Sequence, residues 1–285
     1  MTVNVDSSVT VPGTAAAGSP VRPKRELRRR IGARQALANG LTLAWRNVMQ
    51  LKHSPEKLTD VTLMPIIFLV LFLYVFGGVV AGSTDGYLEQ LLPGLFGQMA
   101  LFASMGLGTA LCEDIHKGVF DRFRSLPIAR SAPLLGAVLG DTVRFCVVMA
   151  VLTGFGSALG FRFHAGPMSI IAAYLIAYVF YQAMCWISAL IGLVAPSPQT
   201  VQGIAVTWTM PLVFGSSVLL AKTSTMPGWL QAWVKVNPVS DLADTVRALT
   251  TGGPVGSHLV YTLVWAAGIM IVAFPLAMRV YLRRV

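Results

Sequence analysis

The sequence predicts an all-α integral membrane protein with six transmembrane helices and both termini in the cytoplasm. Of its 285 residues, 55% are hydrophobic and only 12% are charged, an apolar excess that a water-soluble domain of this size could not keep off its surface. Six apolar stretches approach the ~20 residues that a helix needs to cross a hydrocarbon core. Most Lys and Arg residues flank these stretches on one side, which the positive-inside rule assigns to the cytoplasm.

Six apolar segments are the predicted spans. They are residues 61–81, 91–111, 145–160, 168–195, 201–221 and 259–280. The third is short because Asp141 and Arg144 precede its apolar run, and we expect these two residues at its cytoplasmic rim. Apart from Asp141, the spans lack carboxylates of the kind that proton-driven pumps use.

The net charge of +10 would suggest nucleic acid as the partner of a soluble protein. Here the cations lie beside the predicted spans, where they attract anionic lipid headgroups. We therefore predict membrane lipids, and no nucleic acid, as contacts of the basic segments. The three cysteines form no CxxC pair and the four histidines are scattered, so no metal site is predicted.

The chain divides into three predicted regions. Residues 1–30, rich in small residues and then in Arg, predict a disordered basic cytoplasmic tail. Residues 31–58 predict an amphipathic helix in the membrane interface, and residues 59–285 hold the six spans. Trp45 lies on the apolar face of the interfacial helix, Arg46 lies on the polar face, and Pro55, which Glu56 follows, ends the helix before the first span. Its role is either anchoring or contact with a cytoplasmic partner.

The segment between the second and third spans predicts a second amphipathic helix, from Cys112 to Pro127. One face is apolar, and the other carries charges of alternating sign at i, i+4 spacing. The apolar face includes Phe120 and Phe123, and the charged face comprises Glu113, Lys117, Asp121 and Arg124. A helix with two such faces favours contact with a partner, although a solvated connector is the alternative.

The segment 222–257 between the last two spans predicts two short helices outside the membrane. Trp229 and Trp233 mark the first and suit the interfacial aromatic belt. Asn237-Pro238 breaks it, and Ser240 is expected to cap the second helix. The pair forms either a lid over a pathway or a packed cap.

Enzymatic chemistry is not indicated, and no catalytic residue is predicted. The sequence lacks the GxxxxGK[ST] loop that cradles nucleotide phosphates. The close pair Asp241 and Asp244 falls in the external segment, away from cytoplasmic substrates that would need Mg²⁺. Energy for any transport must therefore come from elsewhere.

The segment after the second span resembles the membrane subunits of ABC-2 exporters, and in particular the daunorubicin/doxorubicin-resistance permeases of actinobacteria. That family carries the pattern Glu-x-x-x-Gly-x-x-(Asp/Glu)-Arg-x-Arg-x-x-Pro after its second span. The matching residues are Gly118, Asp121, Arg122, Arg124 and Pro127. Glu113 or Asp114 supplies the acidic position. The resemblance extends to residues 45–56 before the first span and 226–240 before the last.

The resemblance implies a multi-pass permease of the bacterial plasma membrane that effluxes amphipathic drugs. It implies two copies of a separate cytoplasmic ABC ATPase, which bind ATP and Mg, and a permease homodimer or a pair with a sister permease. This chain would bind no cofactor. The loop would be the coupling helix, with contacts from Glu113, Lys117, Gly118, Phe120, Asp121, Arg122, Phe123, Arg124 and Pro127. A lipid or glycolipid exporter, a membrane-bound transferase and a scaffold for the ATPase are the alternatives.

Two further groups complete the predicted sites. A pathway between spans two and five at the dimer interface would offer aromatic and thioether surface to a drug, although ordinary packing explains the same residues. This group comprises Phe96, Met99, Phe102, Met105, Trp208 and Met210. The external gate would comprise Trp229, Trp233, Asn237 and Pro238.

Overall fold

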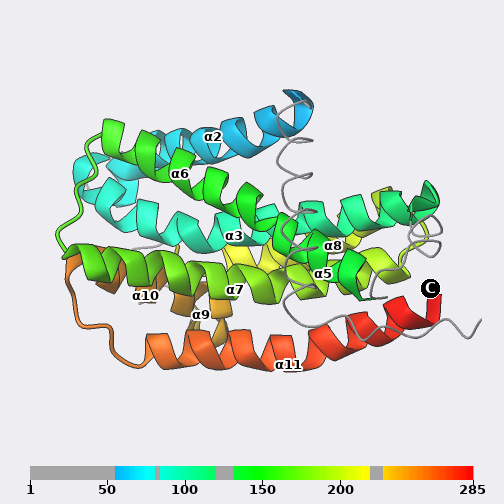
Figure 1. The fold of residues 1–285 in the computed structure, drawn as a ribbon. Helices are drawn as coiled ribbons and strands as arrows, with labels where there is room; N and C mark the ends of the chain where they lie inside the picture. Colours follow the sequence, from blue (N-terminus) through cyan, green and yellow to red (C-terminus); the bar gives the residue numbers. More distant parts are fainter. Residues whose placement is uncertain (1–54, 81–83, 120–130, 219–226, 285) are drawn as a thin grey trace, which may run out of the picture. The chain divides into compact units, whose positions relative to one another are not determined.

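The computed structural model describes residues 55–80, 84–119, 131–218 and 227–284, and all regular structure in these ranges is α-helical (Figure 1). The helices are α2 (Pro55–Val80), α3 (Thr84–His116), α5 (Ala132–Gly140), α6 (Thr142–Ala158), α7 (Pro167–Val194), α8 (Pro198–Phe214), α9 (Gly228–Val236), α10 (Pro238–Thr251) and α11 (His258–Arg284). The predicted all-α class is confirmed for this part of the chain.

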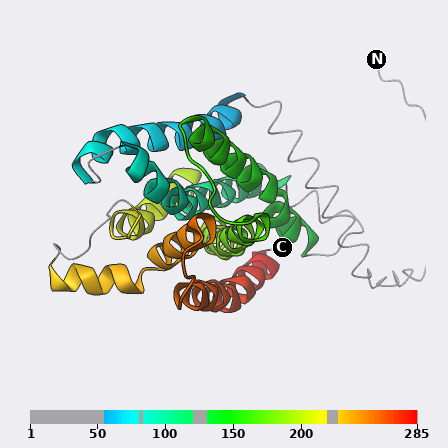
Figure 2. The ribbon, with the colours of Figure 1, turned by 90° about the vertical axis from the view of Figure 1, so that its left-hand side faces the viewer.

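Helix α3 is the central element of the described part. Helix α7 packs along it, and α11 packs on the side of α7 away from α3 (Figures 1 and 2). Helices α2, α6, α8 and α10 also contact α3. The first half of α3, including the run from Leu91 to Leu101, is buried as a result.

Four helical segments have the length and apolar composition to cross a membrane, among the residues that the structure describes. They are Gly86–His116, Pro133–Ala158, Pro167–Val194 and His258–Arg283. The apolar part of α2, Thr62–Gly78, is shorter, and α8 has 17 residues. The outward faces of α2, α7 and α11 expose large apolar side chains such as Tyr74, Ile171 and Ile271, as lipid contact requires. A multi-pass helical fold is established, and the number six stays a prediction.

The third predicted span, 145–160, was wrong at its start. The apolar segment runs from Pro133 to Ala158 and consists of α5 and α6 with Asp141 between them. Asp141 and Arg144 therefore lie inside this segment and not at its rim. Tyr181 of α7 bonds to Asp141, and Gly106 of α3 leaves room for the Arg144 side chain, so these residues do not end the apolar stretch.

The predicted interfacial helix, residues 31–58, overlaps the described residues only at 55–58, which belong to α2, and the rest of it stays a prediction. Pro55 and Glu56 are the first two residues of α2, which continues into the first apolar segment. Proline suits this position because the first residue of a helix needs no N–H partner within the helix. Trp45 and Arg46 lie outside the described residues, as does the tail 1–30.

Candidate functional site

Asn237 joins the two helices of the predicted external hairpin to the end of α8. Its Nδ2 donates hydrogen bonds of 2.7 Å to the carbonyl oxygens of Leu212 and of Gly215. Its Oδ1 accepts a hydrogen bond from the Val239 N–H at 2.9 Å, which caps α10, while Pro238 occupies the first helical position. The start of α10 is thereby fixed to α8.

The expectation that Ser240 caps the second helix was wrong. Asn237 already satisfies the first turn, three residues earlier. The Ser240 hydroxyl instead accepts a hydrogen bond from the backbone N–H of Ser217, at 3.0 Å. Ser240 therefore adds a second link between α10 and the residues that follow α8.

The charged side chains of α10 connect it to three other elements. Asp241 Oδ1 lies 3.0 Å from His258 Nδ1 at the start of α11. Asp244 Oδ1 accepts hydrogen bonds from Arg247 Nη1 at 2.5 Å and from Ser217 Oγ at 3.2 Å. Arg247 Nη2 also donates to the carbonyl oxygen of Gln90 in α3, at 3.2 Å.

Burial shifts the pKa of two of these groups. It raises the pKa of Asp241 above its ordinary value, and the neighbouring His258 opposes that shift. Burial also lowers the pKa of Arg247, and Asp244 opposes this shift. Both charges are thus partly desolvated and depend on their partners, which makes α10 a firmly connected cap.

The two tryptophans of the predicted gate lie on α9. Trp229 is 74% exposed, and Trp233 is 45% exposed with its indole against Gly215. Figure 2 shows α9 extending outward from the other helices. Among the gate residues, Asn237 and Pro238 are therefore buried at a joint, whereas the tryptophans present an aromatic surface.

The opposite end of α3 is held by the turn between α7 and α8. The His116 ring contacts two carbonyl oxygens, those of Cys112 at 2.8 Å through Nδ1 and of Pro196 at 2.9 Å through Nε2. The Cys112 thiol lies 3.8 Å from the Ala195 carbonyl oxygen. This end of α3 and the α7–α8 turn therefore lie together.

Only the first part of the predicted coupling segment lies within the described residues. Glu113 and Lys117 form an exposed ion pair of 3.0 Å on the last turn of α3. Gly118 follows with a φ of +65°, a left-handed conformation that ends the helix. The prediction of one continuous helix from Cys112 to Pro127 was therefore wrong. Outside the described residues lie Phe120, Asp121, Arg122, Phe123, Arg124 and Pro127.

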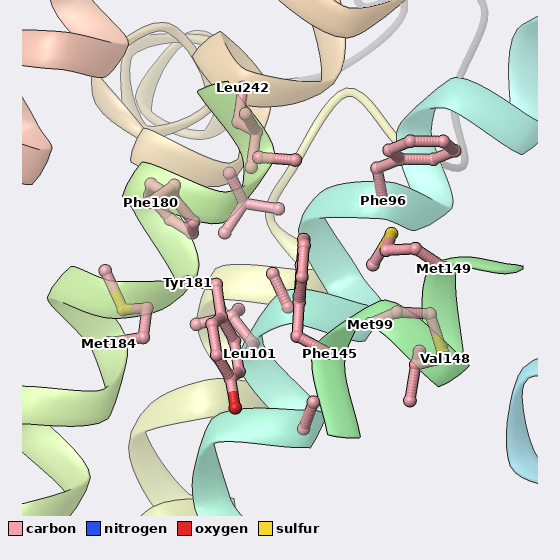
Figure 3. Packing of buried hydrophobic residues seen from close by; sticks show 14 of the residues in the cluster. Phe96, Met99, Leu101, Phe145, Val148, Met149, Phe180, Tyr181, Met184 and Leu242 are labelled. Carbon is pink, nitrogen blue, oxygen red and sulfur yellow. The ribbon is translucent and has the colours of Figure 1, made fainter. Parts of the chain in front are cut away.

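Four of the six predicted pathway residues pack against hydrophobic residues of neighbouring helices. Phe96 and Met99 are almost fully buried, and Figure 3 shows them beside Met149 of α6. Phe96 meets the Tyr174 ring edge-on, at 5.3 Å between centroids. Phe102 packs on a ring of α2 at the same centroid distance, and Trp208 packs on the core.

Met105 and Met210, the other two pathway residues, are partly exposed. Phe102 and Trp208 are partly exposed as well, and a pathway lined by these six residues stays a prediction.

Two buried polar side chains between the helices, Gln98 of α3 and Thr209 of α8, escaped sequence reasoning. Neither polar atom of the Gln98 side chain has a hydrogen-bond partner among the described residues, and Thr209 Oγ1 also lacks one there. The buried Nε1 atom of Trp208, a predicted pathway residue, likewise has no partner among them. A glutamine inside an apolar span was the available sequence signal.

A polar cluster surrounds Asp141, between α5 and α6. The Tyr181 hydroxyl donates to the Asp141 carboxylate at 2.5 Å and approaches its carbonyl oxygen at 3.0 Å. Arg144 Nη1 lies 4.0 Å from the other carboxylate oxygen. Opposite charges at i, i+3 spacing within an otherwise apolar stretch were the signal for this cluster.

These features define a multi-pass α-helical membrane protein with tightly connected ends and no soluble domain among its described residues. Comparison with known families then gives a specific assignment. The family model described as ABC-2 type transporter matches residues 39–250, and the chain belongs to this family.

Relatives with assigned names agree with this family. The chain is 41% identical over 276 residues to the daunorubicin resistance ABC transporter permease protein DrrB1 of Streptomyces coeruleorubidus, covering 95% of this chain and 97% of that protein. It is 29% identical over 216 residues to the probable doxorubicin resistance permease DrrC of Mycobacterium tuberculosis (strain ATCC 25618 / H37Rv), covering 75% and 78%. The chain is accordingly a permease of the bacterial plasma membrane.

Proposed function

We propose that this chain is the membrane subunit of an ATP-driven exporter of anthracycline-like or other amphipathic drugs. The observation that carries the proposal is the 41% identity, over 95% of the chain, to a permease named for daunorubicin resistance. The chain itself lacks a phosphate-cradling loop. ATP and Mg therefore bind a separate ABC ATPase, and this chain contributes the path through the membrane.

The proposed topology has six spans with both termini in the cytoplasm. Hydrogen bonds connect segments that this topology assigns to the same side of the membrane, which supports it. On the cytoplasmic side, His116 meets the α7–α8 turn at Pro196. On the external side, the N–H groups of His164 and Ala165 both donate to the Thr250 carbonyl oxygen.

The cytoplasmic segment after α3 is the proposed docking site for two copies of the ATPase. Its family pattern supports this role, as does its position beside the exposed Glu113–Lys117 pair. The interfacial segment around Trp45 and Arg46 is the second proposed contact. The functional unit is a dimer of this chain or a pair with a sister permease, with lipid around its outer faces.

We expect Arg122→Ala and Asp121→Ala to leave the amount of permease in the membrane unchanged while abolishing export and weakening ATPase binding. Export and copurification of the ATPase are the two measurements. Arg162→Ala, in the loop assigned to the external side, is the matched control and should retain both. Export at the normal rate in both cytoplasmic variants would refute the coupling assignment.

The external hairpin is the proposed gate. Helix α10 closes this end through its bonds to α3, α8 and α11, and α9 presents Trp229 and Trp233 to the interface. The partly exposed Met105 and Met210 are the proposed drug contacts, because thioether side chains adapt to varied ligands. Phe96 and Met99 serve the core.

Substrate-stimulated ATP hydrolysis tests the proposed substrate class. The permease and its ATPase are reconstituted together in proteoliposomes, and hydrolysis is measured with added doxorubicin or with added glycolipid. Stimulation by doxorubicin is expected. Stimulation by the glycolipid alone would favour a lipid exporter, and a permease that does not alter hydrolysis with either compound would favour a scaffold.

A further inference from the structure

The junction between α5 and α6 interrupts the apolar segment Pro133–Ala158 at a charged residue. Asp141 ends α5 and begins α6, and its backbone keeps near-helical angles of φ −72° and ψ −12°. Its N–H bonds to the carbonyl oxygens of Ala137 and Leu139. The two helices therefore meet at a single residue, and α5 is the element that follows the proposed ATPase-docking segment along the chain.

Two tyrosines of α7 hold this junction. The Tyr181 hydroxyl bonds to Asp141 at both its carboxylate and its carbonyl oxygen. The Tyr178 hydroxyl lies 3.1 Å from Oγ1 of the next residue, Thr142. The Tyr181 ring also stacks on Phe145, with 4.7 Å between centroids, and Figure 3 shows the two side chains next to each other. Consecutive residues at the junction are thus attached to one helix.

Helix α3 provides the space for the positive charge of the cluster. The side chains of Arg144 and Asp141 are 16% and 15% exposed, so both charges are largely removed from solvent. A Cβ atom at Gly106 would overlap the Arg144 guanidinium. The glycine therefore leaves a notch in α3 that the arginine fills. Charged groups in an apolar span are costly, and such residues usually have a functional role.

We propose that Asp141 and Arg144 are positioning residues for energy coupling, with Tyr181 holding them in place. They bind the α5–α6 junction to α7 and α3, so that a displacement of α5 moves these helices together. Without the cluster, the junction would bend and the displacement would be absorbed before it reached the external half of the bundle. This inference rests on the proposed ATP-driven export.

The test compares two tyrosine-to-phenylalanine variants on α7. Tyr181→Phe removes the hydroxyl that bonds to Asp141 and keeps the ring that stacks on Phe145. Tyr174→Phe is the matched control, because its hydroxyl bonds to Thr153 of α6, away from the junction. Doxorubicin uptake and ATP hydrolysis are measured in the same everted vesicles that contain permease and ATPase, with membrane content and thermal stability determined for each variant.

We expect Tyr181→Phe to lower the doxorubicin transported per ATP several-fold, because the junction loses the hydrogen bond that attaches Asp141 to α7, and Tyr174→Phe to leave the ratio unchanged. ATPase copurification should be equal in the two variants. An equal transport-to-ATP ratio would overturn the inference. A lack of ATP-driven uptake by the unaltered pair would instead refute the proposed function, and the inference with it.

Gly106→Ala gives an independent second variant. The three atoms nearest to the added methyl group all belong to the flexible end of the Arg144 side chain, which can move aside, so folding should be retained. The same loss of transport per ATP is expected. A normal ratio in this variant together with a normal ratio in Tyr181→Phe would assign the cluster to structure alone.

Discussion

Glycine residues determine how closely α3 and α7 approach. A Cβ atom at Gly108 would lie 2.5 Å from the carbonyl oxygen of Ser188, and one at Gly192 would overlap the backbone of Gly108. Backbone atoms therefore touch backbone atoms at this crossing, as small residues allow in membrane helices. Unlike a side chain, this backbone cannot move aside for a methyl group without shifting a helix.

We predict that Gly192→Ala destabilises the protein. Overpacking costs ~1–3 kcal/mol, which exceeds the gain of up to about 1 kcal/mol in helix propensity. Thermal unfolding of the detergent-purified chain measures the effect. Gly154→Ala is the control, because a Cβ atom there meets nothing within 4 Å. Equal melting temperatures for both variants would contradict the predicted crossing.

The Asp241 carboxyl gives the external cap a dependence on pH. Because burial raises the folded-state pKa of Asp241 above its unfolded value, the folded protein binds this proton more tightly. Its contribution to stability is therefore full below the unfolded pKa and declines as pH rises through the folded pKa. We predict that Asp241→Asn removes this decline.

The melting temperatures of the unaltered chain and of Asp241→Asn are to be compared from about pH 3.5 upward, because the ordinary Asp pKa is about 3.9. The stability of the variant relative to the unaltered chain should increase with pH over this window. A constant difference between the two proteins across the window would contradict the assignment.

At the scale of elements, the α9–α10 joint depends on one side chain. Asn237 both caps α10 and donates two hydrogen bonds to the end of α8. A cap contributes about 1 kcal/mol and each further hydrogen bond about 1 kcal/mol. The stability of this external cap should therefore depend strongly on Asn237.

We predict that Asn237→Ala lowers the free energy of unfolding by ~2–4 kcal/mol, because the cap and both donated bonds are lost. Asn237→Asp keeps the capping oxygen and removes only the donated bonds, so its loss should be smaller. Denaturant unfolding followed by tryptophan fluorescence compares them, since Trp233 lies beside this joint at Gly215. A larger loss for Asp than for Ala would be inconsistent with the role of the cap.

The sequence predicted which segments are helical better than it predicted the residues at which the helices begin and end. Apolar runs revealed the cores of α3, α7 and α11, since hydrophobic length is a local property. The start of the third span could not be predicted from Asp141 and Arg144, because their tolerance depends on Tyr181 and Gly106, which are distant in the chain. The contact between the His116 ring and the Pro196 carbonyl oxygen could not be predicted either, because these two residues are also distant in the chain. The family pattern predicted a coupling segment but not its geometry.

At the scale of the whole molecule, orientation in the membrane is the main structural prediction. Single cysteines report it once the native Cys112, Cys146 and Cys185 have been replaced. We predict that Trp229→Cys reacts with a membrane-impermeant maleimide in intact cells and that Lys117→Cys reacts only after permeabilisation. Both side chains are exposed, so reactivity reports their side of the membrane. Labelling of both in intact cells would refute the six-span topology.

The central claim is that this permease exports drugs with energy from a separate ATPase. ATP-dependent uptake of doxorubicin by everted membrane vesicles tests it most directly, with permease and ATPase present together, each alone, or neither. The account predicts uptake against a gradient only when both subunits and hydrolysable ATP are present. Uptake that persists without this chain, or no ATP-driven uptake when both subunits are present, would contradict it.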